Sequence, residues 1–531
     1  MAPRPNPSSM LVSGIADSHA PSIQGQTRGN AQSRLNFEAA EASIARFDFD
    51  EAHARLDLLA RAATSDADRA RVAFTRAILL IQEGDAKHAC EILSGLIARY
   101  PDRRDFWRSY LTALKGLDMP DAAFVGAHRL YAARFIGDEA PPNPGAHTSR
   151  DATHLHIGYV GPDGHMAILR FLRHLPHSRH RSTFLLRDPA MARHLEREFP
   201  ALGCVLLPAD PETACKAIRA AGIDVLVDLC GHGRGGALEV LARRPAPLIA
   251  TWLDYLATTG VPAVDYRITD WTADPPGNER LHTEELARLP SSAWCYSPST
   301  EAPDVEARSG PLVVGSASIP LKMSERTLAL WRRTLEALPN AHFELVGFLS
   351  TASRERVRQA LGAEVAARTT LHGRLPIASY LAIVDTFHVA LDAVGFSGGT
   401  STLDCLWQGI PVVTLPGTLS HSRSSASMLD HLGLGRWIAR TEDDYVAIAC
   451  EIARGDFGRA ALRRRLAKSA LCDAAKFARG FDDLISSLWT RKGLDGSTRS
   501  PEEHAVAKAI AHPLDTELRR RAFQALREAR A

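Results

Sequence analysis

A pair of glycines and a pair of hydroxyl residues stand together in the C-terminal half of the chain, and this spacing is suited to binding an anion. The four residues, Gly398, Gly399, Thr400 and Ser401, follow a short apolar run over 389–392. Helical spacing of the next apolar residues predicts that a helix begins at the hydroxyl pair. Backbone N–H groups at a helix N-terminus after a glycine-rich turn can bind phosphate, and hydroxyls add donors.

An acidic residue lies one turn further along the same predicted helix. Asp404 could accept a hydrogen bond from a ribose hydroxyl, and a second apolar run over 410–415 follows it. The same spacing also fits an ordinary strand-to-helix turn that a Thr or Ser side chain caps. These residues alone leave both interpretations open.

Composition narrows the class of protein. The chain has 531 residues, enough for about three domains. Its 45% apolar and 23% charged residues are typical of a soluble globular protein. The net charge is +2, from 63 basic and 61 acidic residues, so nucleic acid is not expected as a main partner.

The cysteines and the apolar runs of the sequence indicate the cellular compartment of the protein. The eight cysteines include no Cys-x-x-Cys pair, and most lie in apolar segments, which indicates reduced, buried thiols. No apolar run approaches the roughly 20 residues that span a bilayer. The N-terminus lacks the apolar core of a signal peptide. We therefore expect a cytoplasmic protein without a membrane partner.

A repeated helical pattern occupies the N-terminal quarter. Residues 1–33, rich in Ser, Gly, Asn, Gln and Pro, are expected to form a disordered tail before a helical region at 34–137. Alanines 52, 89 and 122 lie between amphipathic stretches, 37 and then 33 residues apart. This resembles tetratricopeptide repeats, whose period is about 34 residues, and such a solenoid can hold a protein segment. A non-repeating helical bundle is the alternative.

Strands alternate with helices after a Pro/Gly linker at 138–152. We expect one α/β half at 153–308, a second at 309–490 and a helical tail at 491–531. The expected strands lie at 155–160, 184–186, 203–207, 224–228, 247–252 and 266–269, and then at 312–316, 343–347, 369–372, 389–392 and 411–415. This order predicts two doubly wound parallel sheets, with ligands beyond the carboxyl ends of the strands.

Five segments in order carry a family resemblance. They are Gly-Tyr-Val-Gly-Pro-Asp-Gly-His at 158–165, a block at 224–260, Asp-Tyr-Arg-Ile-Thr-Asp at 265–270, Ser-Ala-Ser-Ile-Pro-Leu-Lys at 316–322, and the block at 398–416. Together they resemble the catalytic region of O-GlcNAc transferases, glycosyltransferase family 41, in its bacterial SPINDLY-like form with leading tetratricopeptide repeats. The resemblance covers about 155–490 and implies a GT-B-type pair of α/β domains.

The resemblance also implies roles on the donor side of the site. Lys322 matches the lysine that contacts the donor diphosphate, where a point charge suits a leaving anion. Thr400 and Ser401 match the phosphate-binding helix N-terminus, and Asp404 matches the ribose-binding aspartate. Without the resemblance, Lys322 would be taken for a surface lysine before a helix.

On the acceptor side, His165 matches a histidine near the acceptor hydroxyl, and histidine can act as a base near neutral pH. A loop hydrogen bond is the ordinary alternative for His165. Thr258, Thr259 and Gly260 match the loop that lines the sugar pocket.

Three positions depart from the family pattern. Gly399 stands where the family usually has histidine, and Ile319 stands where it usually has glutamine. Tyr380 takes the place of a histidine beside the uracil and could still stack on a base. The first two changes remove hydrogen-bond donors near the second phosphate and the sugar, so they put the identity of the donor in question.

We expect a protein O-glycosyltransferase that inverts the anomeric centre and uses no metal and no cofactor besides its nucleotide-sugar donor. The resemblance makes UDP-GlcNAc the default donor, and Ser or Thr of a protein recruited by the helical repeats the acceptor, with flagellin as one candidate. One alternative is a flagellin-type enzyme that uses a CMP-linked nonulosonic acid, whose single phosphate needs fewer contacts. Another is a repeat-bearing binding protein without activity.

Overall fold

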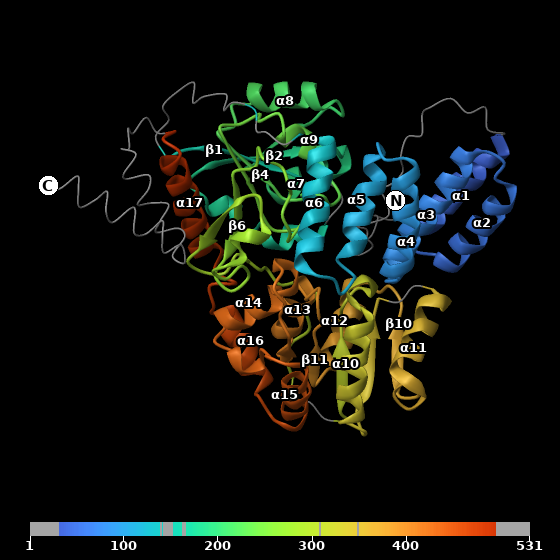
Figure 1. Cartoon of the computed structure of the whole chain (residues 1–531). Coiled ribbons are helices and arrows are strands. Elements are labelled where there is room, and N and C mark those ends of the chain that lie inside the picture. Colours follow the sequence, from blue (N-terminus) through green and yellow to red (C-terminus); the bar gives the residue numbers. More distant parts are fainter. Residues whose placement is uncertain are drawn as a thin grey trace, which may run out of the picture.

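Helix pairs open the described part of the chain in this computed structural model (Figure 1). The structure describes residues 31–137, 141, 152–161, 166–306, 310–347 and 350–494. The expected tail at 1–33 and linker at 138–152 therefore lie almost wholly outside the described residues, as does the tail beyond 494. The first six helices are α1 (Ala31–Ala45), α2 (Phe49–Ala62), α3 (Asp66–Glu83), α4 (Ala86–Arg99), α5 (Arg104–Leu114) and α6 (Asp121–Phe135).

Polar side chains cap the N-termini of helices α2, α3 and α4. The side chains of Asp48, Ser65 and Asp85 accept hydrogen bonds from the first turns of α2, α3 and α4. Gly84 ends α3 in the left-handed region, with a φ of 80°. The first six helices form the three helix–turn–helix units that the sequence predicts, but Ala52, Ala89 and Ala122 lie in the first turn of the second helix of each pair and not between the helices.

A seven-stranded parallel sheet forms the first α/β unit, green in Figure 1. Its strands, in the order β3-β2-β1-β4-β5-β6-β7, are β1 (His156–Val160), β2 (Arg181–Leu186), β3 (Gly203–Leu206), β4 (Val225–Asp228), β5 (Leu248–Thr251), β6 (Tyr266–Asp270) and β7 (Glu285–Leu289). Its connections carry α7 (Pro189–Glu198), α8 (Pro211–Ala220), α9 (Leu238–Leu241) and the 3₁₀ helices η3 (Met166–Phe171), η4 (Leu175–His177) and η5 (Asn278–Leu281).

The sequence does not predict the edge strand β7. Its residues Glu285 and Arg288 are only partly buried, so charges interrupt the apolar run. Charged side chains are common on edge strands, where they hinder pairing with another chain.

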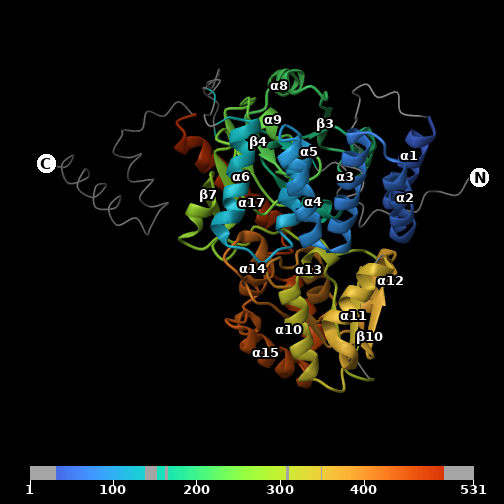
Figure 2. The same ribbon diagram turned by 45° about the vertical axis from the view of Figure 1, so that its right-hand side comes forward.

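A five-stranded parallel sheet forms the second α/β unit, below the first in Figures 1 and 2. Its strands, in the order β10-β9-β8-β11-β12, are β8 (Val313–Ser316), β9 (His342–Val346), β10 (Thr369–His372), β11 (Val389–Leu391) and β12 (Val412–Val413). Its helices are α10 (Glu325–Glu336), α11 (Thr351–Ala366), α12 (Ile377–Asp385), α13 (Thr400–Trp407), α14 (Ser424–His431), α15 (Glu442–Arg454) and α16 (Arg459–Ala467), with η6 (Pro320–Lys322), η7 (Ser420–Ser422) and η8 (Gly435–Trp437).

The last described helix corrects the expected extent of the second half. Helix α17 (Ala474–Arg491), red in Figure 1, returns to the first unit instead of remaining in a block that ends at 490. Phe477 and Phe481 on this helix pack on Trp252 and His174 of the first unit. The apolar face of α17 must be buried, but the apolar periodicity of one helix does not indicate which sheet it packs against.

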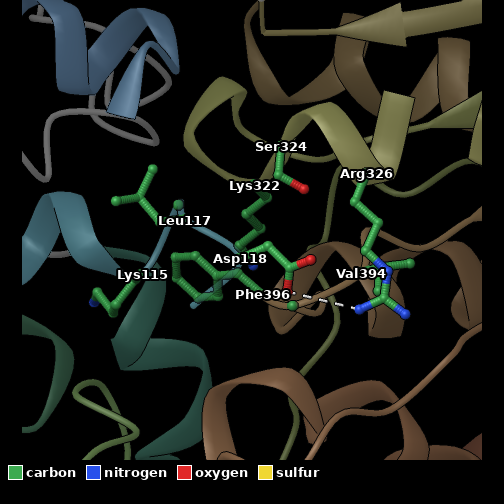
Figure 3. A pocket seen from close by; sticks show the side chains of 10 residues that line it. Lys115, Leu117, Asp118, Lys322, Ser324, Arg326, Val394 and Phe396 are labelled. Carbon is green, nitrogen blue, oxygen red and sulfur yellow. Dashed lines mark ion pairs between the residues drawn. The ribbon is translucent and has the colours of Figure 1, made fainter. Parts of the chain in front are cut away.

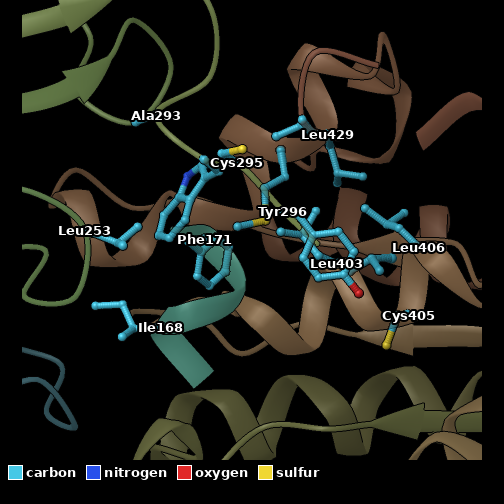
Figure 4. Close-up of a cluster of buried hydrophobic side chains, with 14 of the residues drawn as sticks. Ile168, Phe171, Leu253, Ala293, Cys295, Tyr296, Leu403, Cys405, Leu406 and Leu429 are labelled. Atoms are coloured by element: carbon cyan, nitrogen blue, oxygen red, sulfur yellow. The ribbon is translucent and has the colours of Figure 1, made fainter. Parts of the chain in front are cut away.

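A common hydrophobic cluster joins the two α/β units. Figure 4 shows Phe171 and Tyr296 from the first unit and its exit segment beside Leu403 and Leu406 of α13. All eight cysteines are free, as expected, and six of them are buried. Within the described ranges, no helix is long and apolar enough to cross a bilayer.

Candidate functional site

The strand order of the second sheet reverses between β8 and β11, and the candidate site lies at their carboxyl ends. These two parallel strands are neighbours, so the segments that leave them open onto the same edge of the sheet. One segment leads from Ser316 to Lys322, and the other leads from Leu391 to the N-terminus of α13. Lys322 Nζ donates a hydrogen bond to the carbonyl oxygen of Ser397, at 2.6 Å, and this bond joins the two segments.

The N-terminus of α13 carries no side-chain cap. Its N-cap residue is Gly399, so a capped turn of the ordinary kind is excluded. Thr400 and Ser401 are half-buried, and their hydroxyls have no hydrogen-bond partner within the described residues. Two hydroxyls and the first backbone N–H groups of the helix are therefore available to an anion.

The two glycines before the helix have different surroundings. Gly398 donates its N–H to Asp392 Oδ1 at 2.7 Å, and a Cβ at this position would lie 2.1 Å from Thr402 Oγ1. Gly399 has a φ of −121°, and a Cβ there would meet no atom within 4 Å. The packing therefore requires glycine at 398, whereas it leaves room for a side chain at 399.

Lys322 is a partly buried cation. Burial lowers the pKa of its ammonium to about 8, and the positive charge of Lys115 acts in the same direction. The carboxylate of Asp392 opposes this shift. The ammonium also lies 4.5 Å from the centroid of the Phe396 ring. A cation that water solvates poorly interacts strongly with a bound anion.

A second lysine reaches the same place from the helical region, and the sequence gives no signal for it. Lys115 follows the last residue of α5, and its Nζ lies 4.4 Å from the ring centroid of Tyr255 and 5.2 Å from that of Phe396. Figure 3 shows Lys115, Phe396 and Lys322 together in one pocket. The pocket is lined by Lys115, Gly116, Leu117, Asp118, Lys322, Ser324, Arg326, Val394, Gly395 and Phe396.

Asp404 lies in a polar cluster between the α/β units. Its Oδ1 accepts hydrogen bonds from Arg170 Nη2 at 2.6 Å and from the Tyr296 hydroxyl at 2.7 Å. The Tyr380 hydroxyl is 3.4 Å from Oδ2, which leaves this oxygen able to accept a further bond. The structure thus brings Asp404 and Tyr380 together, and it adds Arg170 and Tyr296, which no motif singled out. The predicted contacts with ribose and base stay predictions.

The predicted sugar-pocket loop is turned toward a buried carboxylate. Thr258 Oγ1 donates to Glu284 Oε2 at 2.7 Å, and Thr259 bonds Glu284 Oε1 through its N–H, at 2.6 Å, and its hydroxyl. Gly260 has a φ of 73°, and a Cβ there would lie 2.7 Å from the carbonyl oxygen of His128 in α6. The loop therefore positions the helical region against the first unit, and its contact with a sugar stays a prediction.

Two further sequence predictions concern single residues. His165, the predicted base, lies outside the described residues. Ile319 caps η6 with its side chain 38% exposed, so it contributes no polar group beside Lys322. The loss of a family donor at this position stays a prediction.

Comparison with known proteins agrees with this architecture. The model of "Glycosyl transferase family 41" matches residues 208–297 and 318–479. A protein of Oryza sativa subsp. japonica described as "Probable UDP-N-acetylglucosamine--peptide N-acetylglucosaminyltransferase SPINDLY" is 31% identical over 422 residues, which are 74% of this chain and 45% of the relative. Its counterpart in Hordeum vulgare is 30% identical over 417 residues, 74% of this chain and 44% of the relative. The chain thus spans less than half the length of these curated relatives.

A solved structure supports the fold. A mutant of the Thermobaculum terrenum O-GlcNAc transferase superposes with a TM-score of 0.78 at 24% identity, over 89% of this chain and 100% of that one. These similarities agree with the two parallel sheets and the leading helix pairs of the structure. The family match extends over both α/β units. The chain belongs to glycosyltransferase family 41, the O-GlcNAc transferase family.

Proposed function

We propose that this protein transfers GlcNAc from UDP-GlcNAc to Ser or Thr side chains of a protein acceptor, with inversion and without a metal ion. Several relatives carry names that describe UDP-N-acetylglucosamine–peptide N-acetylglucosaminyltransferases. The observation that supports the proposal most is the position of Lys322. Its ammonium bonds the Ser397 carbonyl, three residues before the first residue of α13, so a cation and an uncapped helix N-terminus face the same space.

This arrangement suits the departure of a nucleoside diphosphate. When an acceptor hydroxyl attacks the anomeric carbon of the sugar, the bond to the diphosphate breaks and negative charge grows on the leaving oxygen. Lys322 and the N–H groups of α13 are already in position and can stabilise that charge without moving. Such preorganised groups are usually the largest electrostatic contribution to catalysis. A metal ion is not needed for this task. In this proposal, Tyr380 stacks on the base, and Asp404 accepts a hydrogen bond from the ribose through Oδ2.

The acceptor hydroxyl must lose a proton as the new bond forms. We assign this step to His165 on the strength of the sequence match, because an imidazole near its ordinary pKa can accept a proton at neutral pH. We also assign recruitment of the acceptor to the helix pairs of the N-terminal region.

A thermal-shift panel of UDP-, GDP-, dTDP- and CMP-sugars tests the choice of donor. A donor at 100 times its dissociation constant should stabilise the protein by about 2.7 kcal/mol. We expect UDP-GlcNAc and UDP to raise the melting temperature of the wild type, and Lys322→Ala to lose most of this shift. A shift with CMP-sugars alone would contradict the proposed donor, and no shift with any nucleotide would contradict the proposed enzyme.

Transfer itself is measured by mass spectrometry of proteins that carry the new sugar. Lys322→Ala should lower the rate about 10²- to 10³-fold, as the loss of one preorganised group at a developing anion commonly does. Lys468→Ala is a matched control, since Lys468 is an exposed lysine at the end of α16. Equal rates in the two variants would refute the role of Lys322.

A further inference from the structure

The helical region contributes a charged side chain to the candidate donor site. Lys115 and Lys322 belong to segments more than 200 residues apart in the chain, yet both ammonium groups lie within about 5 Å of the Phe396 ring centroid. The lining of their shared pocket holds three cations, Lys115, Lys322 and Arg326, against the single carboxylate of Asp118. Asp118 and Arg326 face each other at 3.8 Å, so the two lysines are the excess charge of the lining, and the carboxylates of Asp254 and Asp392 act on them from outside it.

The backbone around Lys115 is fixed tightly against the turn that carries Lys322. A Cβ on Gly116 would lie 2.7 Å from Leu321 Cδ1 and 2.9 Å from the Leu321 carbonyl oxygen. A Cβ on Gly84, at the end of α3, would lie 2.2 Å from the Pro320 carbonyl oxygen. Two glycines of the helical region thus permit the close approach of η6, and the separation of the two lysines is set by packed backbone.

Two ammonium groups in one partly buried pocket repel each other, and this repulsion costs stability unless an anion lies between or beside them. Within the described residues, the Lys115 ammonium forms no ion pair within 4.0 Å; it lies against the faces of Tyr255 and Phe396, and the carboxylate of Asp254 acts on it from further away. Burial lowers the pKa of the Lys115 ammonium, so this cation is poorly hydrated. A diphosphate carries two or more negative charges and would relieve the repulsion.

We propose that Lys115 binds the diphosphate of the nucleotide sugar together with Lys322, so that the helical region completes the donor site. This rests on the proposed function, and it adds a residue and a role to it. The helical region is then part of the donor site as well as the expected platform for the acceptor.

The test compares Lys115→Met with the wild type in the full-length protein. Methionine keeps an unbranched apolar stem for the two rings and removes the charge. Calorimetric titration with UDP, and ligand-observed NMR with uridine, give the two dissociation constants. We expect Lys115→Met to weaken UDP about 10- to 100-fold, as the loss of one charge-assisted contact would, and to leave uridine unchanged. Lys115→Arg should retain most of the affinity for UDP, since it keeps the charge.

Lys87→Met is the matched control, because Lys87 is an exposed lysine of the same helical region, on α4. It should bind UDP as the wild type does. If Lys115→Met bound UDP as the wild type does, or lost UDP and uridine affinity by the same factor, Lys115 would have a merely structural role and the inference would be wrong. Failure of the wild type to bind UDP would instead overturn the proposed function.

Discussion

A methyl group on Gly116 should disturb both the stability of the protein and its donor site. Alanine at this position would place its Cβ 2.7 Å from Leu321 Cδ1, 2.8 Å from Ala86 Cβ and 2.9 Å from the Leu321 carbonyl oxygen. The φ of Gly116 lies outside the left-handed region, so the backbone itself accepts alanine. The expected cost is therefore steric, and overpacking of this kind costs about 1–3 kcal/mol.

Gly95→Ala provides the opposite expectation from the same helical region. Gly95 is exposed within α4, and a Cβ there would meet no atom within 4 Å. Alanine should stabilise the protein there by about 0.5–1 kcal/mol, because glycine in a helix loses more backbone freedom on folding. The two substitutions add the same methyl group, so a loss of stability at Gly116 that Gly95→Ala does not show reports the packing around Gly116.

Urea unfolding followed by circular dichroism measures the midpoints, and titration with UDP measures the donor site. We expect Gly116→Ala to lower the midpoint, Gly95→Ala to raise it slightly, and only Gly116→Ala to weaken UDP. Since Leu321 directly precedes Lys322, relief of the clash must move the turn that holds this cation. The reasoning is refuted if Gly116→Ala is as stable as Gly95→Ala and binds UDP as the wild type does.

Three more outcomes follow from the site. Burial lowers the pKa of Lys322 to about 8, so its charge is present below pH 8 and is lost above it. UDP affinity should therefore fall about tenfold from pH 7 to pH 9. Lys322→Arg stays charged, so its UDP affinity should change less over this range in the same titration. Asp404→Asn leaves the guanidinium of Arg170 without its carboxylate. Calorimetry should show a loss of folding stability near the lower end of the roughly 3–5 kcal/mol typical of broken buried pairs, because Arg170 remains 15% exposed. A melting temperature equal to that of the wild type would count against this. Gly399→His should strengthen UDP-GlcNAc binding about tenfold by adding a donor in open space, whereas Gly399→Ala should bind as the wild type does; equal losses in both would reveal a backbone requirement.

The sequence predicts the repetitive and local parts of this structure well. Strands β1 to β6 and β8 to β12 appear as short apolar runs between helical patterns, and all of them are present. The edge strand β7 escapes prediction because Glu285 and Arg288 break its apolar pattern. The return of α17 to the first sheet could not be predicted, because an amphipathic pattern indicates an apolar face but not the element that this face packs against.

The residues of the candidate site likewise fall into those that could be predicted and those that could not. Thr400 and Ser401 could be singled out because they follow a strand and a glycine pair at a predicted helix N-terminus, whereas Lys322 is singled out only by the family resemblance. Lys115 and Arg170 could not, since each reaches the site from another part of the chain and only tertiary packing brings it there. Nothing in the residues around either of them distinguishes a site cation from a surface one.

The close packing of the helical region against both α/β units limits how this protein could be re-engineered. Helix α6 is fixed to the first unit by His128, a fully buried residue whose Nε2 lies 2.7 Å from the Tyr255 hydroxyl, and Gly84 and Gly116 hold α3 and α5 against η6. A chimaera that fuses the two sheets directly to a foreign repeat array would therefore lose Lys115 and Gly116 from the pocket that Lys322 lines. The pair α1–α2 shares a separate small hydrophobic cluster with Val72 and Leu79 of α3, so an exchange of this pair must supply a new apolar partner for these two side chains.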